Sequence, residues 1–405
     1  MKTAAIICEY NPFHNGHAYQ IDYIKKNTDT DRIIAIISGD FVQRGEPAVI
    51  CKEARTRMAL EAGVDAVFLL PVVYSTGSAD MFAKGAVTIA CGLNADYLCF
   101  GSECGDIAAL QEAASILSKE GNADSPKIKE KMSEGLTFAK ARALSFPEYE
   151  KILSSPNNVL GIEYIIAGQS MNAGFKYITH KRVGAAYNDL SINTDSDKQS
   201  ATALRSIIRN GKPDDIKPFV PECAFNILRG EIVHNRVLTS DNFSDILFAK
   251  LMNMDENEQF LEVSPDLYNR IKNLLPAYKG FEDFVDSIKA KNHTRTGLMR
   301  ALTHILLNIH AKPSNTIVSF KDVSKLAHVR LLGFREDHAD VLTHIKKTGT
   351  LNIVSKVPDV LQSLDSFNKA LFDQDLCAST LYDYAITRKE SSARTPEYSK
   401  PVIKV

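Results

Sequence analysis

TAAIICEYNPFHNGH, residues 3–17, joins a short apolar run to a turn and then to a pair of histidines. The run from Ala4 to Cys8 has the length and composition of a buried strand. Asn11-Pro12 interrupts it and indicates a turn. After residue 16, larger side chains recur at helical spacing, at Tyr19, Tyr23 and Ile24. The stretch therefore predicts a strand that turns directly into a helix, with His14–His17 at the junction.

Such a junction is suited to binding phosphate. The first turn of a helix presents unpaired N–H groups and the positive end of the helix dipole, which together attract anions. Gly16 lets the backbone approach a bulky ligand, and His14 and His17, one turn apart, can donate to phosphate oxygens from the same side. The alternative is two surface histidines beside a turn. With 10 His and 21 Gly in 405 residues, H-x-G-H is expected by chance only about 0.01 times, which favours the phosphate site.

The rest of residues 1–120 alternates between apolar runs and helical patterns. Strands are predicted at 3–8, 32–37, 65–70 and 96–100, and helices at 16–27, 51–62, 79–93 and 106–120. Apolar strands separated by helices predict an α/β fold with a Rossmann-like parallel sheet covered on both faces. Ligands bind such sheets at the carboxyl ends of the strands, where His14–His17 lies. No G-x-G-x-x-G follows the first strand and no G-x-x-x-x-G-K-[ST] occurs, so dinucleotide fingerprints and P-loops are excluded.

Farther along, the pattern changes. Residues 125–170 are predicted to be helical, 174–183 a strand and 200–211 a helix, and beyond about 215 helices dominate. We therefore expect two domains: a catalytic nucleotide-binding domain over 1–215 and a mainly helical one over 216–405. The polar tail from 391 to 405, with two prolines, is expected to fray.

Composition narrows the class of protein. The net charge is −1, so a nucleic-acid partner must be held by a local patch. Seven cysteines form no C-x-x-C pair, which favours reduced thiols in the cytoplasm, and the spacing of Cys99 and Cys104 argues against zinc. No metal ligands are predicted. The start of the chain has neither a signal-peptide nor a membrane-span pattern.

Several polar motifs follow the predicted strand ends. They are SGDFVQRGEPA (38–48), FGSE (100–103), SPNN (155–158), Lys181-Arg182 and SATALR (200–205). Thr202 and Arg205, at a helix start, are suited to the β- and γ-phosphates of a nucleotide. Each motif alone is also explained by helix capping or a surface cation, but together they converge on one edge of the sheet.

EYNPFHNGH (9–17), together with these motifs, LGIEY (160–164) and LLGF (331–334), resembles the tRNA(Met) cytidine acetate ligase family, within the nucleotidyltransferase-like group marked by H-x-G-H. The resemblance implies a bacterial cytoplasmic enzyme that uses ATP to activate acetate as acetyl-adenylate. It then acetylates N4 of the wobble cytidine in the anticodon loop of elongator tRNA(Met). Mg²⁺ would neutralise the pyrophosphate.

The resemblance also implies site residues. His14 and His17 would be catalytic, and one of Asn157 and Asn158 would contact ATP. The remaining implied ATP contacts are Ile7, Cys8, Glu9, Tyr10, Asn11, Pro12, Phe13, His14, Asn15, Gly16, His17, Ala18, Tyr19, Gln20, Gly101 and Arg182. Ala201 stands where the broader group often has a hydroxyl, so SATALR matches that group imperfectly.

Residues 286–350 carry eleven Lys and Arg against five Asp and Glu. Such a stretch is either a solvated helical face or a surface that docks tRNA. The alternative function is a small-molecule adenylyltransferase of the pantetheine-phosphate or nicotinate-mononucleotide kind. Those enzymes need little beyond the H-x-G-H core, whereas here nearly half of the chain follows it.

Overall fold

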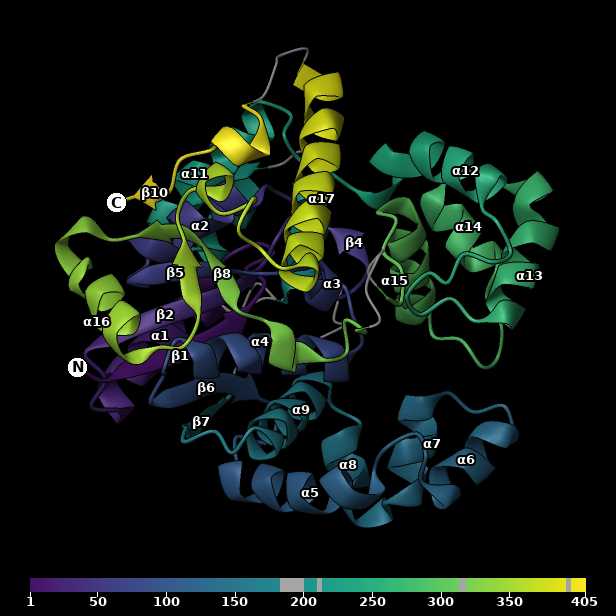
Figure 1. Ribbon diagram of the computed structural model, residues 1–405, viewed down its shortest axis with the longest axis horizontal. Helices are drawn as coiled ribbons and strands as arrows, with labels where there is room; N and C mark the ends of the chain where they lie inside the picture. The colour runs from purple at the N-terminus through teal and green to yellow at the C-terminus, as the bar shows by residue number, and fades with distance from the viewer. Residues whose placement is uncertain (183–199, 210–212, 313–317, 391–394) are drawn as a thin grey trace.

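The computed structural model describes residues 1–182, 200–209, 213–312, 318–390 and 395–405. A twisted sheet forms its centre, in the strand order β10-β8-β5-β2-β1-β6-β7, with β9 paired to β8 (Figure 1). The five strands predicted from the sequence are confirmed and run parallel to one another. Their bounds are β1 Thr3–Cys8, β2 Arg32–Ser38, β5 Ala66–Leu70, β6 Tyr97–Ser102 and β7 Lys176–Lys181.

β1 lies at the point where the strand order reverses. The chain proceeds from β1 outward to β2 and β5, and then returns to the other side of β1 to form β6 and β7. Ile33–Ile37 of β2 is buried throughout, as expected for a strand with helices on both faces. Because loops diverge at such a reversal, a crevice opens at the carboxyl ends of β1 and β6.

The helices predicted over residues 1–120 are confirmed to within about a residue at each end. These are α1 Asn15–Asn27, α2 Lys52–Glu61, α4 Ala79–Gly92 and α5 Ile107–Glu120. A two-stranded hairpin and one helical turn lie between them, as β3 Phe41–Val42, β4 Glu46–Pro47 and α3 Val72–Ser75. The helical pattern of 125–170 forms α6 Pro126–Ser133, α7 Phe138–Ser145, α8 Glu150–Leu153 and α9 Pro156–Ser170. In Figure 1, α6 to α8 make a lobe below the sheet.

The later part of the chain is mainly helical, as predicted. Its helices are α10 Ala201–Arg209, η2 Pro213–Phe219, α11 Glu222–Val233, α12 Ser244–Asn253, α13 Pro265–Leu274, α14 Phe281–Ser287, α15 Arg295–Leu306, α16 Asp340–Thr348 and α17 Ser366–Glu390. Residue 183 of the predicted strand 174–183, residues 210 and 211 of the predicted helix 200–211, and residues 313–317 of the basic segment lie outside the described residues.

Besides the hairpin β3–β4, three strands of the central sheet were not predicted from the sequence. β8 His328–Phe334 pairs antiparallel with β5, and β9 Asn352–Val354 and β10 Ile403–Lys404 pair with β8. The sheet is thus completed by residues from the last fifth of the chain. Four residues of β8 are buried and three are half-buried, and Arg330 stands between its apolar residues, so its sequence lacks the continuous apolar run that marks β2.

The expectation that the tail frays is wrong for residues 395–405, while 391–394 lie outside the described residues. Glu397, in η8 Glu397–Ser399, is 2% exposed. Lys52 of α2, also buried, places its Nζ 2.9 Å from Glu397 Oε2 and 2.8 Å from Asp40 Oδ2. Lys400 extends this network, with its Nζ 2.8 Å from Glu397 Oε2 and 3.0 Å from Glu53 Oε1. The tail is therefore tied to the sheet by buried charge as well as by β10.

Candidate functional site

His14 and His17 form a reciprocal cap at the start of α1. Gly16 N donates to His14 Nδ1 at 3.0 Å, and His14 N donates to His17 Nδ1 at 3.2 Å. This is the capping-box arrangement, with imidazoles in place of the usual hydroxyl and carboxylate. Because both Nδ1 atoms accept from backbone N–H groups, each neutral ring carries its proton on Nε2.

The spacing of the motif follows from this cap. The two rings are stacked, with centroids 3.7 Å apart and planes at 20°. A Cβ on Gly16 would lie 2.8 Å from His14 Cε1, so only glycine leaves room for the first ring. Histidines at the N-cap and N3 positions, with glycine between, thus place two rings side by side at the end of a helix.

Both histidines are neutral at neutral pH. Burial, together with the positive charge of Arg182, lowers the pKa of His14 to about 3. Burial also lowers the pKa of His17, as do His14 and Arg182. Each ring therefore offers one Nε2–H donor at the positive end of a helix dipole, which is suited to an anion.

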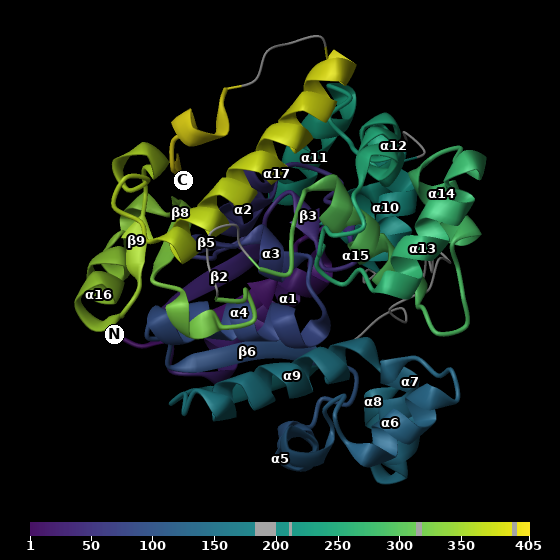
Figure 2. The same ribbon diagram turned by 45° about the vertical axis from the view of Figure 1, so that its right-hand side comes forward.

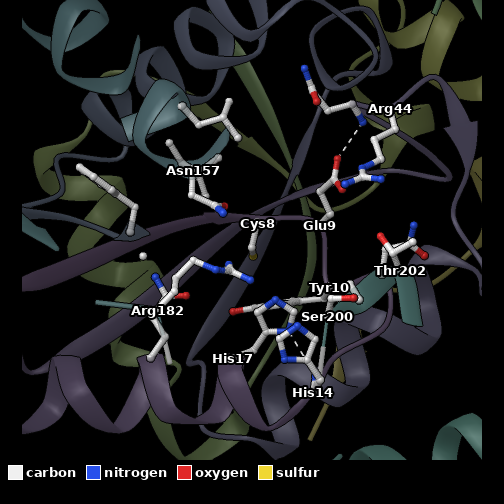
Figure 3. A pocket seen from close by; sticks show the side chains of 18 of the residues that line it. Cys8, Glu9, Tyr10, His14, His17, Arg44, Asn157, Arg182, Ser200 and Thr202 are labelled. Carbon is white, nitrogen blue, oxygen red and sulfur yellow. Dashed lines mark hydrogen bonds between the residues drawn. The ribbon is translucent and has the colours of Figure 1, made fainter. Parts of the chain in front are cut away.

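The pair faces a cleft of about 1010 Å³ at the carboxyl ends of β1 and β6 (Figure 3). The structure brings the following residues named in the sequence analysis to its walls: Ile7, Cys8, Glu9, Tyr10, Asn11, His14, His17, Gln20, Gly101, Asn157, Arg182, Thr202 and Arg205.

Other implied residues do not line the cleft. Phe13 is buried and packs its ring against Tyr10 and His17. Asn15 Nδ2 donates to Pro218 O at 3.0 Å, and the Tyr19 ring packs against Tyr23. Pro12, Gly16 and Ala18 belong to the backbone frame of the turn and of α1. These residues hold the loop in place rather than bordering the open space.

The structure separates the two asparagines at the start of α9. Asn157 lines the cleft, whereas Asn158 Oδ1 accepts from Glu103 N at 2.9 Å and from Cys104 N at 3.1 Å. Glu103 in turn accepts from Asn158 N at 2.9 Å. Both asparagines therefore tie α9 to the loop after β6, since Asn157 Nδ2 also donates to Glu103 Oε1 at 2.6 Å. Asn157 differs from Asn158 in that it borders the cleft.

The cleft has two chemically different ends. Phe100, Leu160 and Tyr164 give one end an apolar wall, with Asn157 and Arg182 beside it. At the other end the lining residues are Glu9, Gln43 and Arg44, with Ser200, Thr202 and Arg205 at the start of α10. In Figure 3, Asn157 and Arg182 lie on one side of Cys8, and Glu9 and Arg44 on the other. The histidine pair lies below and between them.

Arg205 links the two loops that frame this second end. Its Nη1 donates to Asn11 O at 3.1 Å, and its Nη2 lies 3.3 Å from Thr202 Oγ1 and 3.3 Å from Glu46 Oε1. The guanidinium, 8% exposed, thus joins α10 to the loop after β1 and to the 41–47 hairpin.

Some lining residues were missed as site residues from the sequence. Gln43 and Arg44 belong to a quoted motif, but only the hairpin geometry brings them to the cleft. Gly45, at φ +71°, packs so tightly on α15 that a Cβ would lie 2.3 Å from Arg300 N. Phe100 begins the motif FGSE, and Leu160 and Tyr164 belong to LGIEY, but none of the three was predicted to line the site. Phe82 also lines the cleft and carries no sequence signal beyond that of a core position.

Within the described residues, no three His, Cys, Asp or Glu side chains come together as a metal site. No described helix combines the length and apolar character needed to cross a bilayer.

Comparisons with known proteins agree on one family. Residues 1–397 match the family described as HIGH Nucleotidyl Transferase. The chain is 36% identical over 413 residues to the tRNA(Met) cytidine acetate ligase of Thermoanaerobacter sp. (strain X514), covering 100% of both. The relative of that name from Caldicellulosiruptor saccharolyticus is 36% identical over 386 residues, covering 94% of both. A crystal structure of Thermotoga maritima TmcAL bound with alpha-thio ATP matches with a TM-score of 0.88 at 29% identity and 100% coverage of both chains. The chain therefore belongs to the tRNA(Met) cytidine acetate ligase family of HIGH nucleotidyl transferases.

Proposed function

We propose that this chain is an ATP-dependent ligase that acetylates N4 of the wobble cytidine of elongator tRNA(Met). The observation that carries the proposal is the stacked His14–His17 pair, whose two neutral donors border the cleft at the carboxyl ends of β1 and β6. Two facts about the relatives support the proposal: they share the name tRNA(Met) cytidine acetate ligase, and the Thermotoga maritima protein binds an ATP analogue in its crystal structure.

In the first step, a carboxylate oxygen of acetate attacks the α-phosphorus of ATP, and pyrophosphate leaves with the electron pair of the broken P–O bond. Acetate is a weak nucleophile, so the step depends on position and on donors aimed at the developing charge. The Nε2–H groups of His14 and His17 would meet the α-phosphate oxygens. The N–H groups at the start of α10, with Thr202 and Arg205, would meet the departing phosphates.

The two ends of the cleft would bind different substrates. The adenine would lie against Phe100, Leu160 and Tyr164, beside Asn157 and Arg182. Gly101 allows this approach, because a Cβ there would lie 3.1 Å from the His180 ring and 3.2 Å from Arg182 Cγ. The acceptor would then enter from the end formed by Glu9 and Arg44.

In the second step, the cytosine amine attacks the acetyl carbon and AMP leaves. The base must leave its stack to reach the cleft, and bases of an anticodon loop do so at modest cost. A mixed anhydride is readily hydrolysed, so we expect the adenylate to form chiefly when the cleft is closed over tRNA.

Mg²⁺ is proposed to accompany the nucleotide, held by phosphate oxygens and water. The described residues do not provide a cluster that would fit the ion on its own. The roles proposed above for His14, His17, Thr202 and Arg205 therefore do not involve the ion.

The direct test is incubation with ATP, labelled acetate and total bacterial tRNA, followed by nucleoside analysis. We expect labelled N4-acetylcytidine that requires all three components. Release of pyrophosphate with 4′-phosphopantetheine or nicotinate mononucleotide, and none with acetate and tRNA, would instead identify a small-molecule adenylyltransferase.

The residues of the basic segment 286–350 do not form one surface but lie on separate parts of the molecule. β8 lies in the sheet, and α16 and α14 lie on opposite sides of the molecule in both ribbon views (Figures 1 and 2). Arg330 is paired with buried Glu397, and Arg295 with Glu282 and Asp286. We propose that Lys289 and Lys291, exposed after α14, contribute to tRNA docking.

Replacing Lys289 and Lys291 with alanine should weaken tRNA binding and reduce the slope of log K against log salt by about 1 to 2, because each phosphate contact releases counterions. ATP-dependent pyrophosphate release at saturating tRNA should be unchanged. The matched control replaces Lys346 and Lys347, exposed on α16. An equal loss of slope in both variants, or in neither, would mean that docking is not localised after α14.

A further inference from the structure

Glu9 is a fixed carboxylate at the acceptor end of the cleft. It follows the last residue of β1, and its Oε1 accepts from Gln43 N at 2.7 Å. The carbonyl oxygen of Glu9 accepts from Arg55 Nη1 at 2.7 Å, which holds the backbone. In the part of the chain that the structure describes, Oε2 accepts no hydrogen bond. Figure 3 shows the side chain directed into the cleft, beside Arg44.

The second step of the proposed reaction needs a proton acceptor. The lone pair of the cytosine amine is delocalised into the ring, so this nitrogen is barely basic. When N4 bonds to the acetyl carbon, the bond between that carbon and the phosphate oxygen breaks, and AMP leaves with its electron pair. N4 must then give up one of its two protons, and general bases placed for such transfers contribute about 10²–10⁴-fold.

The other groups that line the cleft are unsuited to this role. His14 and His17 each hold their proton on Nε2, and their Nδ1 atoms already accept from backbone N–H groups. The arginines remain protonated. Burial raises the pKa of the Cys8 thiol and that of the Tyr10 hydroxyl, so neither ionises near neutral pH. Among the described lining residues, Glu9 is the one carboxylate.

The surroundings of Glu9 suit a base that works near neutral pH. Burial raises the pKa of Glu9 and the charge of Glu46 in β4 raises it further, opposed by the Gln43 N–H and by Arg44 and Arg205. The net shift is upward, which brings a carboxylate closer to the pH of the reaction while leaving it an acceptor. A carboxylate is also a poor partner for a triphosphate, so Glu9 is better matched to the amine than to ATP.

We propose that Glu9 accepts the proton released from the cytidine N4 amine during acetyl transfer. This inference rests on the proposed function and deepens it. It assigns Glu9 to the acceptor substrate, in place of the ATP contact that the family resemblance implies.

The test separates the two steps in Glu9→Gln. A glutamine oxygen can still accept from Gln43 N–H, so the loop after β1 should hold, which a thermal melt checks. Adenylate formation is measured with ATP, acetate and tRNA as acetylhydroxamate trapped by hydroxylamine, which needs no enzymic base. Transfer is measured as N4-acetylcytidine formed in a single turnover with enzyme in excess over tRNA.

We expect transfer to fall by at least about 100-fold, with hydroxamate formation changed less than about threefold. The wild-type transfer rate should fall as the pH drops through the Glu9 pKa, because protonation removes the acceptor. Glu9→Gln should lose that dependence, and Glu9→Asp should retain it. Equal losses in both steps would make Glu9 a binding or structural residue, and an unchanged transfer rate would make it a loop anchor only. If the wild-type protein formed no hydroxamate, the proposed function itself would fail.

Discussion

Replacing His17 with glutamine is expected to slow acetate-dependent cleavage of ATP by on the order of 10²–10³-fold while leaving the protein folded. Glutamine is a natural residue for the N3 position of a capping box, so it can still accept from His14 N. It cannot reproduce an Nε2–H held at the far side of a ring stacked on His14. The measurement is pyrophosphate release with ATP, acetate and tRNA, beside a thermal melt.

His17→Ala is the matched comparison, because it removes the donor and the cap together. Loss of a helix cap costs about 1 kcal/mol, so this variant should be less stable than His17→Gln but similarly slow. A wild-type rate in His17→Gln would show that the ring serves the helix alone. The phosphate role would then have to be sought on His14 or on the N–H groups of α1.

The second large effect is expected on stability, from Lys52→Met. The change leaves Asp40 and Glu397 facing one another in a buried site without the ammonium that lies within 2.9 Å of both. Removing one partner of a buried ion pair typically costs about 3–5 kcal/mol. Urea unfolding should therefore show a much lower midpoint with the same slope.

The control for Lys52→Met is Lys84→Met, which breaks the exposed pair with Asp80, where the two side chains are 37% and 52% exposed. Surface pairs of this kind contribute about 1 kcal/mol or less. Adding Asp40→Asn to Lys52→Met should recover part of the lost stability, because Asp40 loses the cation with which it is paired, whereas Glu397 keeps Arg330 and Lys400. If both single lysine variants unfolded at the same urea concentration, the buried ion pairs of Lys52 would contribute no more to the free energy of unfolding than the exposed pair of Lys84.

The pH dependence of unfolding provides an independent check. Burial alone would raise the pKa of Asp40, but the charges of Lys52 and Lys400 hold it below its usual value. A carboxyl whose folded pKa is depressed adds stability above its unfolded pKa and loses it as the pH falls through the folded value. Wild-type stability should therefore decline below about pH 4, and Lys52→Met should lose part of that decline.

The sequence predicts those parts of the fold whose signal is carried by residues close together in the chain. β2 is recognisable because Ile33–Ile37 is apolar at every position, and α1 because its cap and spacing lie within a few residues. β8 has no such mark, since its pairing with β5 joins segments about 260 residues apart. Glu397 looks like a solvated tail residue until Lys52, 345 positions away, is placed beside it.

The same distinction applies to the site. H-x-G-H is a local arrangement, and the structure supplies the physical reason for each of its letters. The choice between Asn157 and Asn158 depends on the orientation of α9, because consecutive helical residues point about 100° apart. Phe82 and Tyr164 line the cleft only because of how α4 and α9 pack, and their sequence context is that of any core helix.

The buried contact between Lys52 and Glu397 also bears on how the protein is made. The ribosome releases the nucleotide-binding strands long before it reaches the residues that complete their sheet and neutralise Lys52. During synthesis this lysine has Asp40 and Glu53 beside it, but neither Glu397 nor Lys400. A nascent chain therefore holds an unfinished core until Glu397, Lys400 and β10 emerge. A truncated chain that ends before Glu397 lacks these buried ion pairs, which makes it a natural target for proteases that recognise incompletely folded chains.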